Sequence, residues 1–106
     1  MTQTETLEID IANEISPTLF IRKTAVDLFE KIEHAPESVI VVDFKNVDFL
    51  NRSFAHEYLK LKYSSEKKIS EIHLSNDVEL MISIVKNAHF KERDRYYQIV
   101  SGQKSN

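Results

Sequence analysis

The stretch that decides the fold is residues 39–61, VIVVDFKNVDFLNRSFAHEYLKL. Its first part, residues 39–44, is a run of mostly β-branched residues that ends in Asp-Phe. Such an unbroken apolar run is typical of a central strand that is buried on both faces. After a turn at residues 45–47, apolar residues recur at helical spacing from about residue 52 to residue 65. The stretch therefore predicts a strand, a turn and a helix, with helices on both sides of the sheet.

Similar units lie on the N-terminal side of this stretch. Residues 6–11, TLEIDI, alternate apolar and acidic residues, which is the pattern of a half-buried strand. Residues 22–34 have the spacing of an amphipathic helix, and Pro36 ends it. Residues 18–21 are interpreted as an extended entry into that helix, with the first helical turn as the alternative.

On the C-terminal side, residues 70–75, SEIHLS, predict a further short strand. Asn76 then begins a third helix, because Asn76 and Glu79 have the spacing of a capping box with Asn as the cap. Residues 91–106 are expected to form a C-terminal extension, with a last strand, a helix or a mobile segment as alternatives and a partly disordered tail.

Strands and helices therefore alternate along the chain, and this order predicts parallel neighbouring strands with right-handed crossovers. We expect a single α/β domain over residues 1–106, with a three-layer or open arrangement. The sheet should be small and parallel or mixed, with about three to four strands and three to four helices.

The composition excludes several classes of function. The chain has one glycine, Gly102, so phosphate loops and dinucleotide fingerprints that depend on glycines cannot form. It has no cysteine, which excludes disulfides, thiolate metal sites and cysteine nucleophiles, and fits a cytoplasmic location. The net charge of −3 argues against a role in binding nucleic acid. No apolar run is long enough to span a membrane.

The sequence also offers no catalytic or metal-binding motif. His56-Glu57 would begin a zinc-binding helix motif only with a second histidine at position 60, which is Lys60. The remaining histidines are scattered singly along the chain. We therefore expect no metal, no cofactor and no enzymatic activity.

Several motifs in and around residues 39–61 resemble the STAS domains, the family of bacterial anti-sigma factor antagonists. The similarity is greatest to a STAS-like branch of uncharacterised role and covers about residues 5 to 90. In that branch a buried strand ends in Asp-Phe, a turn carries Val-x-Phe, and the next helix opens with Ser-Phe-Ala and an acidic residue. The corresponding residues here are Asp43-Phe44, Val47-Asp48-Phe49 and Ser53-Phe54-Ala55-His56-Glu57. Arg22 and Ala25 match the opening of the first helix, and residues 72–78 match a strand that leads into a capped helix.

The resemblance implies a non-catalytic regulatory module that binds a protein partner. The implied partner is a histidine-kinase-type ATPase or another anti-sigma-like regulator. The switch serine of phosphorylatable STAS domains falls on Ser53, within residues 51–54. Phe54 stands where those domains have a glycine, and its side chain is expected on the surface that a partner approaches.

Physical reasoning about Ser53 gives two interpretations. If Asn51 caps the helix, Ser53 lies in the first turn, near free amide groups and the positive end of the helix dipole. A phosphate there would be stabilised, with help from Arg52. The alternative is that Ser53 is an ordinary helix-start residue, because serine is common at that position.

Asp43 at the end of the central strand also has two interpretations. In open α/β sheets the carboxyl ends of the strands form ligand crevices, and Asp43, Asp48, Asn51 and Ser75 are expected to face that edge. This predicts, as an alternative function, a small-ligand- or nucleotide-binding domain that uses Asp43 and Asp48. The simpler interpretation is that Asp43 binds turn amides. The complete predicted contact surface for a partner is Asp43, Asp48, Phe49, Asn51, Arg52, Ser53, Phe54 and Glu57.

Overall fold

The computed structural model describes residues 5–90 of the chain. Within them, strands and helices alternate as the sequence predicts, apart from one additional short helix after the first strand. The elements are β1 (Thr6–Asp10), α1 (Ile11–Glu14), α2 (Arg22–His34), β2 (Val39–Asp43), α3 (Arg52–Ser64), β3 (Lys68–Ile72) and α4 (Asn76–His89). The predicted α/β class, the number of strands and the number of helices are confirmed for this part of the chain.

The three strands form a parallel sheet in which β2 lies between β1 and β3. The register places Leu7, Ile40 and Ile69 side by side across the sheet. Residues paired in this way point to the same face of a parallel sheet, so these three apolar side chains share one face. A helix follows each strand, as parallel pairing requires.

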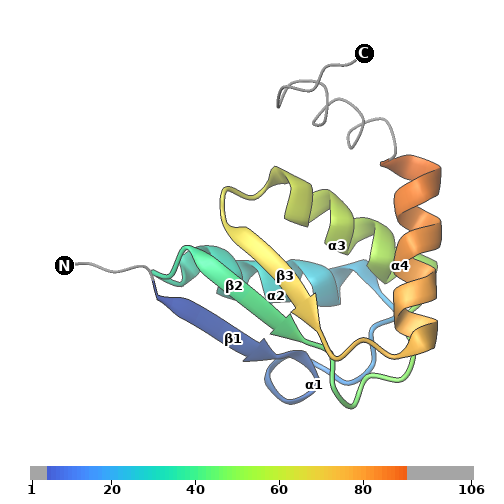
Figure 1. The fold of residues 1–106 in the computed structure, drawn as a ribbon, viewed down its shortest axis with the longest axis horizontal. Helices are drawn as coiled ribbons and strands as arrows, with labels where there is room; N and C mark the ends of the chain where they lie inside the picture. The colour runs from blue at the N-terminus through green and yellow to red at the C-terminus, as the bar shows by residue number, and fades with distance from the viewer. Residues whose placement is uncertain (1–4, 91–106) are drawn as a thin grey trace.

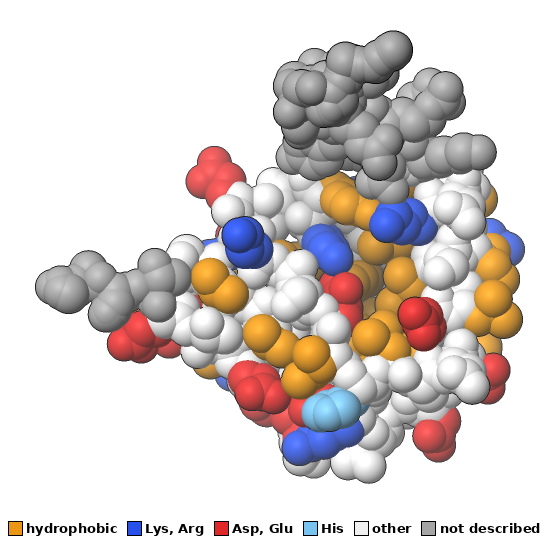
Figure 2. All heavy atoms as spheres, viewed as in Figure 1, with side chains coloured by type: hydrophobic (Ala, Val, Ile, Leu, Met, Phe, Trp, Pro, Cys, Tyr) orange, Lys and Arg blue, Asp and Glu red, His pale blue; other side chains and the backbone are white. Residues whose placement is uncertain are grey.

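Both crossover helices, α2 and α3, cover the same face of the sheet (Figure 1). Ile40 and Val42 point to that face and are fully buried, whereas Val39 and Val41 point to the other face and are only half-buried. No helix within residues 5–90 covers that second face, where charged and apolar side chains lie together (Figure 2). The expectation of helices on both faces is therefore wrong.

The strand order explains this one-sided arrangement. The strands lie in the sheet in the same order as in the chain. When successive crossovers have the same handedness and the strand order never reverses, the helices fall on one side. The run of valines in β2 is compatible with this because β-branched residues also suit half-exposed strand positions.

The core between the sheet and the helices is centred on Tyr58 of α3, which is fully buried. Its ring packs edge-on against Phe29 and Phe44, with centroids 5.6 and 5.9 Å away, and stacks on Phe54 at 6.0 Å. Its hydroxyl donates a hydrogen bond of 2.5 Å to Oε2 of Glu71 in β3. A buried phenol therefore has a charged acceptor, and α3 is joined to the edge strand.

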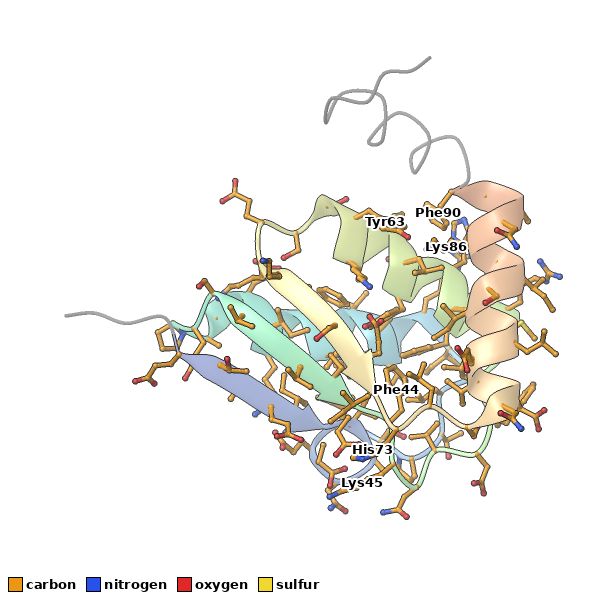
Figure 3. The ribbon with its side chains drawn as sticks, in the orientation of Figure 1. Phe44, Lys45, Tyr63, His73, Lys86 and Phe90 are labelled. Atoms are coloured by element: carbon orange, nitrogen blue, oxygen red, sulfur yellow. The ribbon has the colours of Figure 1, made fainter. Side chains whose placement is uncertain are left out.

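Helix α4 lies beside β3 and packs against α3 rather than on the sheet (Figure 1). Val78 and Val85 form its buried face, with Met81 and Ile82 half-buried beside them, whereas Ala88 is exposed. Phe90 at its end is buried against Tyr63 of α3, with ring centroids 5.4 Å apart (Figure 3).

The start of α4 differs slightly from the prediction. The helix begins at Asn76 as expected, but the cap is Ser75, whose hydroxyl accepts a hydrogen bond from the amide of Val78. The strand before it is β3, Lys68–Ile72, and it ends earlier than predicted. His73 has a φ of 59°, in the left-handed region, so the extended backbone cannot continue through it.

Two features lie before α2. The short helix α1 was not predicted, and it forms because Asp10 caps it by accepting from the amide of Asn13. The extended entry at residues 18–21 is confirmed, since Leu19 forms a parallel bridge with Leu50.

No helix within residues 5–90 is long and apolar enough to cross a membrane. The predictions for residues 91–106 lie outside the described residues.

Candidate functional site

The beginning of α3 is fixed by Asn51. Its side-chain oxygen accepts a hydrogen bond of 3.0 Å from the amide of Phe54, which confirms the predicted cap. Its Nδ2 donates to the carbonyl of Phe20 at 2.9 Å, and its backbone amide donates to the carbonyl of Leu19. One asparagine therefore caps α3 and holds the entry to α2 alongside it.

This attachment creates an exposed apolar surface, which we call the aromatic patch and define as Phe20, Ile21 and Phe49. The two phenylalanines are each 44% exposed, and Ile21 is 59% exposed. The rings of Phe20 and Phe49 touch, with centroids 5.9 Å apart. The sequence predicted Phe49 as a contact residue. The spacing of the phenylalanines also makes Phe20 and Phe49 candidates for the core, and their exposure shows that this expectation is wrong. The pairing of the two segments depends on the tertiary fold.

Ser53 lies in the first turn of α3, four residues after Phe49 in the chain. Arg52 and Ser53 are the first two helical residues, and both are exposed. Their exposure and their place after the Asn51 cap agree with the predicted geometry. A modifying enzyme or a partner can therefore reach the Ser53 hydroxyl.

Three residues of the predicted contact surface are instead buried. Phe54 is fully buried in the core, so the expectation that its side chain lies on the approach surface is wrong. Glu57 is buried and forms ion pairs of 3.5 Å with Arg22 and with Lys60. Asp43 is buried at the end of β2. Asp48, Phe49, Arg52 and Ser53 are exposed and Asn51 is half-buried, so these five are the accessible part of that surface.

A pocket of about 250 Å³ opens beside Ser53, and we call it the cationic pocket. Its lining consists of Arg22, Arg52, Ser53, His56 and His89. The ring of His89 on α4 meets the ring of His56 edge-on, with centroids 4.9 Å apart. No sequence pattern indicates this assembly, because its members come from three helices that are far apart in the chain.

Burial lowers the pKa of His56 below its ordinary value, and the nearby His89 and Arg22 lower it further. The negative charge of Glu57 raises the pKa of His56, whereas the positive charge of Lys60 lowers it further. His56 therefore tends to be neutral at physiological pH. A negative charge placed in the pocket would raise the pKa of His56.

At the carboxyl edge of the sheet, Asp43 is engaged by its own turn. Its Oδ1 accepts hydrogen bonds of 2.9 Å from the Lys45 amide and from Nδ1 of His73. Lys45 extends toward the same carboxylate, with Nζ 3.9 Å from Asp43 and 3.6 Å from Asp10. Figure 3 shows Lys45 and His73 together at the ends of β2 and β3. The structure thus gives Asp43 the turn-binding contacts of the simpler interpretation.

Burial by itself raises the pKa of Asp43. The hydrogen bond from the Lys45 amide, the hydrogen bond and charge of His73 and the charge of Lys45 together outweigh burial, and the pKa lies below its ordinary value. Asp43 is therefore ionised at neutral pH.

The other residues expected at this edge are also accounted for. The Ser75 hydroxyl, besides capping α4, donates to the backbone carbonyl of Asp48, so these two residues connect the turn to α4. Among residues 5–90 no group of three or more histidine and carboxylate side chains could hold a metal ion.

Comparison of the chain with protein-family models, with curated proteins and with solved structures gives no significant match in any of the three. The fold and the contacts of the described residues therefore carry the functional argument. The resemblance to STAS domains stays a prediction from the sequence.

Proposed function

We propose that this chain is a non-catalytic regulatory module that binds a protein partner through the start of α3. The contact surface consists of the aromatic patch together with Arg52 and Ser53. The observation that carries the proposal is the pair of exposed phenylalanine rings, in contact with each other on the segments that lead into α2 and α3. The first turn of α3 then presents the exposed Ser53. Contiguous exposed aromatic residues at a polar rim are typical of protein contact surfaces.

The rigidity of this surface supports the same proposal. Asn51 links both backbone segments that carry the aromatic patch, so the rings are presented by a fixed frame. A preorganised surface loses little conformational entropy on binding. The resemblance to STAS domains adds the class of partner, a histidine-kinase-type ATPase or another anti-sigma-like regulator.

Phosphorylation of Ser53 is the proposed switch. A phosphoryl group on Ser53 would add about two negative charges to the proposed contact surface. A partner that covers Phe49 would have to desolvate those charges, so modification is expected to release it. Arg52 lies next to Ser53 in the sequence and is a candidate to pair with the phosphoryl group.

The contact surface is tested by affinity purification with four forms of the chain: wild type, Phe49→Asp, Ser53→Asp and Leu80→Asp. Leu80 is a matched control because it is 60% exposed on α4, outside the proposed surface. We expect a protein retained by wild type and by Leu80→Asp to be lost from the other two. Undiminished retention by a Phe20→Asp/Phe49→Asp double variant would contradict the proposal.

The switch requires a separate measurement. The purified chain is incubated with ATP and the retained partner, and the site of any phosphate is found by mass spectrometry. The proposal expects modification at Ser53, absent from Ser53→Ala. Modification only at other serines would contradict the proposed switch, and Ser53 would then be an ordinary residue at the start of a helix.

A further inference from the structure

The cationic pocket has an unusual lining. Arg22 comes from the first turn of α2, Arg52, Ser53 and His56 come from α3, and His89 comes from the end of α4. Four of these five residues carry a positive charge or can acquire one, and none is acidic. Positive groups that converge without a carboxylate between them produce a strong local potential for an anion.

Nearby ion pairs neutralise this charge only in part. Glu57 is the carboxylate that contacts the cluster, and it is shared between Arg22 and Lys60, each 3.5 Å away. Within residues 5–90 Arg52 forms no ion pair. A guanidinium with five hydrogen-bond donors is thus left available at the rim of the pocket.

His56 gives a second, independent indication of a ligand. Its Nδ1 is buried and has no hydrogen-bond partner among the described residues. Buried polar atoms in folded proteins are almost always paired, and an exception calls for a missing partner. The ring that carries this atom lines the cationic pocket beside His89 and Arg22, so a ligand there would meet positive neighbours and negative charge would suit it.

Two helices begin at this site. Arg22 is the first residue of α2, whose N-terminus has no side-chain cap, and Arg52 is the first residue of α3. Helix N-termini favour anions because their first amide groups lack partners within the helix. Pockets for drug-sized ligands have volumes of about 300–1,000 Å³, so a pocket of about 250 Å³ suits a smaller ligand.

We propose that the cationic pocket binds a phosphate-type oxyanion. The arginines would contact its oxygens, and the histidines would contribute hydrogen bonds and, when protonated, charge. The anion has two possible sources, a free phosphate or phosphorylated small molecule and the phosphoryl group of a modified Ser53. The second source rests on the proposed function, whereas the first does not.

The binding test uses inorganic phosphate, titrated into the full chain by calorimetry at constant ionic strength to remove general screening effects. We expect saturable binding, weakened roughly tenfold in Arg52→Gln, since one charge-assisted hydrogen bond is worth about that factor. Lys23→Gln is the matched control, because it removes the same charge beside Arg22 but outside the pocket lining. Arg52 and Lys23 are both exposed, and thermal melts verify that both variants are folded.

A second readout follows the histidine rings by NMR as a function of pH, with and without sulfate, an anion whose charge stays constant over this range. Bound anion should raise the pKa of His56, since it offsets the positive neighbours that lower it. His34 is the internal control, because its Nδ1 donates to the Glu30 carbonyl at the far end of α2. At any given pH, the ring signals of His34 should be the same with and without sulfate.

The source of the anion is distinguished with a chain that carries phosphoserine at position 53. If the phosphoryl group on Ser53 occupies the pocket, this chain no longer binds inorganic phosphate and its His56 already titrates at the raised pKa. If the phosphoserine chain still binds phosphate, the anion comes from outside.

The proposal is overturned if wild type shows no saturable phosphate binding, or if Arg52→Gln and Lys23→Gln bind as wild type does. Neither result would affect the proposed partner surface, which affinity purification tests independently through Phe20 and Phe49.

Discussion

At the scale of single residues, the buried carboxylate of Asp43 holds together the carboxyl end of the sheet. It accepts from the Lys45 amide and from His73, and it lies near the Lys45 ammonium group. The turn after β2 contains Asn46 in the left-handed region, with a φ of 65°. Asparagine tolerates this conformation, and the hydrogen bond from the Lys45 amide keeps the turn closed.

Asp43→Asn is expected to destabilise the protein by about 1–3 kcal/mol, because a buried charged acceptor loses its pairing with His73 and Lys45. The free energy of unfolding is measured by urea denaturation. Asp48→Asn is the control, since that side chain is exposed, and it should change stability by less than about 0.5 kcal/mol. Equal effects of the two changes would contradict the structural role of Asp43.

The lowered pKa of Asp43 also predicts a dependence of stability on pH. The unfolded chain has the ordinary pKa of 3.8, and the folded chain has a lower one. Between these two pKa values the unfolded state binds more protons than the folded state. The stabilisation that ionised Asp43 gives to the folded protein is therefore fully present above pH 3.8, and it is lost as the pH falls through the folded pKa. Acid unfolding of wild type and Asp43→Asn should therefore converge at the lowest pH, and a constant difference would contradict this.

At the scale of elements, α3 is anchored both at its start and along its length. Asn51 caps the helix and binds Phe20 of the neighbouring segment. Further along the helix, Tyr58 and Lys62 both donate to Oε2 of Glu71 in β3, at 2.5 and 2.8 Å. These contacts connect the helix that carries Ser53 to α2 and to the sheet.

Replacement of Asn51 separates its two functions. Asn51→Ala should cost about 1–2 kcal/mol, because the cap and the hydrogen bond to the Phe20 carbonyl are both lost. Asn51→Ser should recover the part of this free energy that comes from capping the helix, because a serine hydroxyl can also accept from the amide of Phe54. Thermal and urea unfolding measure the difference, and a serine variant no more stable than alanine would show that capping contributes little.

The contact between α3 and β3 is tested by a double-mutant cycle with Tyr58→Phe and Glu71→Gln. Each single change should cost about 1–2 kcal/mol, since each removes or weakens a partly buried hydrogen bond to a charged group. The double variant should cost less than their sum by about 0.5–2 kcal/mol. Additive costs would mean that the hydroxyl and the carboxylate do not interact.

At the scale of the whole molecule, residues 5–90 form a three-stranded sheet with both crossover helices, α2 and α3, on one face and with α4 packed against α3. Neighbouring valines of β2 therefore lie in different environments. Val42 is fully buried beneath the helices, and Val41 is half-buried on the opposite face.

Substitution of these two valines by threonine, which has the same shape, tests the one-sided architecture. Val42→Thr should destabilise the folded protein by about 1–3 kcal/mol, because the new hydroxyl is buried without a hydrogen-bond partner. Val41→Thr should cost less than about 0.5 kcal/mol, since threonine suits a half-exposed strand. Urea unfolding compares the two variants, and equal large costs would indicate that a further layer covers the second face.

The sequence by itself determined the order of the elements and several of their bounds. The helix predicted at residues 22–34 is α2, and the helix predicted from residue 52 is α3. Both depend on hydrophobic periodicity and on local end signals, such as Pro36 and the Asn51 cap, that a short window of sequence contains. The exposure of Ser53 follows from the same local geometry.

Only the tertiary structure decided which side chains of these elements come into contact with one another. Strand order placed both crossover helices on one face of the sheet. The aromatic patch and the cationic pocket combine residues from separate segments, as with Phe20 and Phe49 or His56 and His89. The physical reason is that periodicity tells which side of an element is apolar, whereas the crossing of elements determines what that side meets.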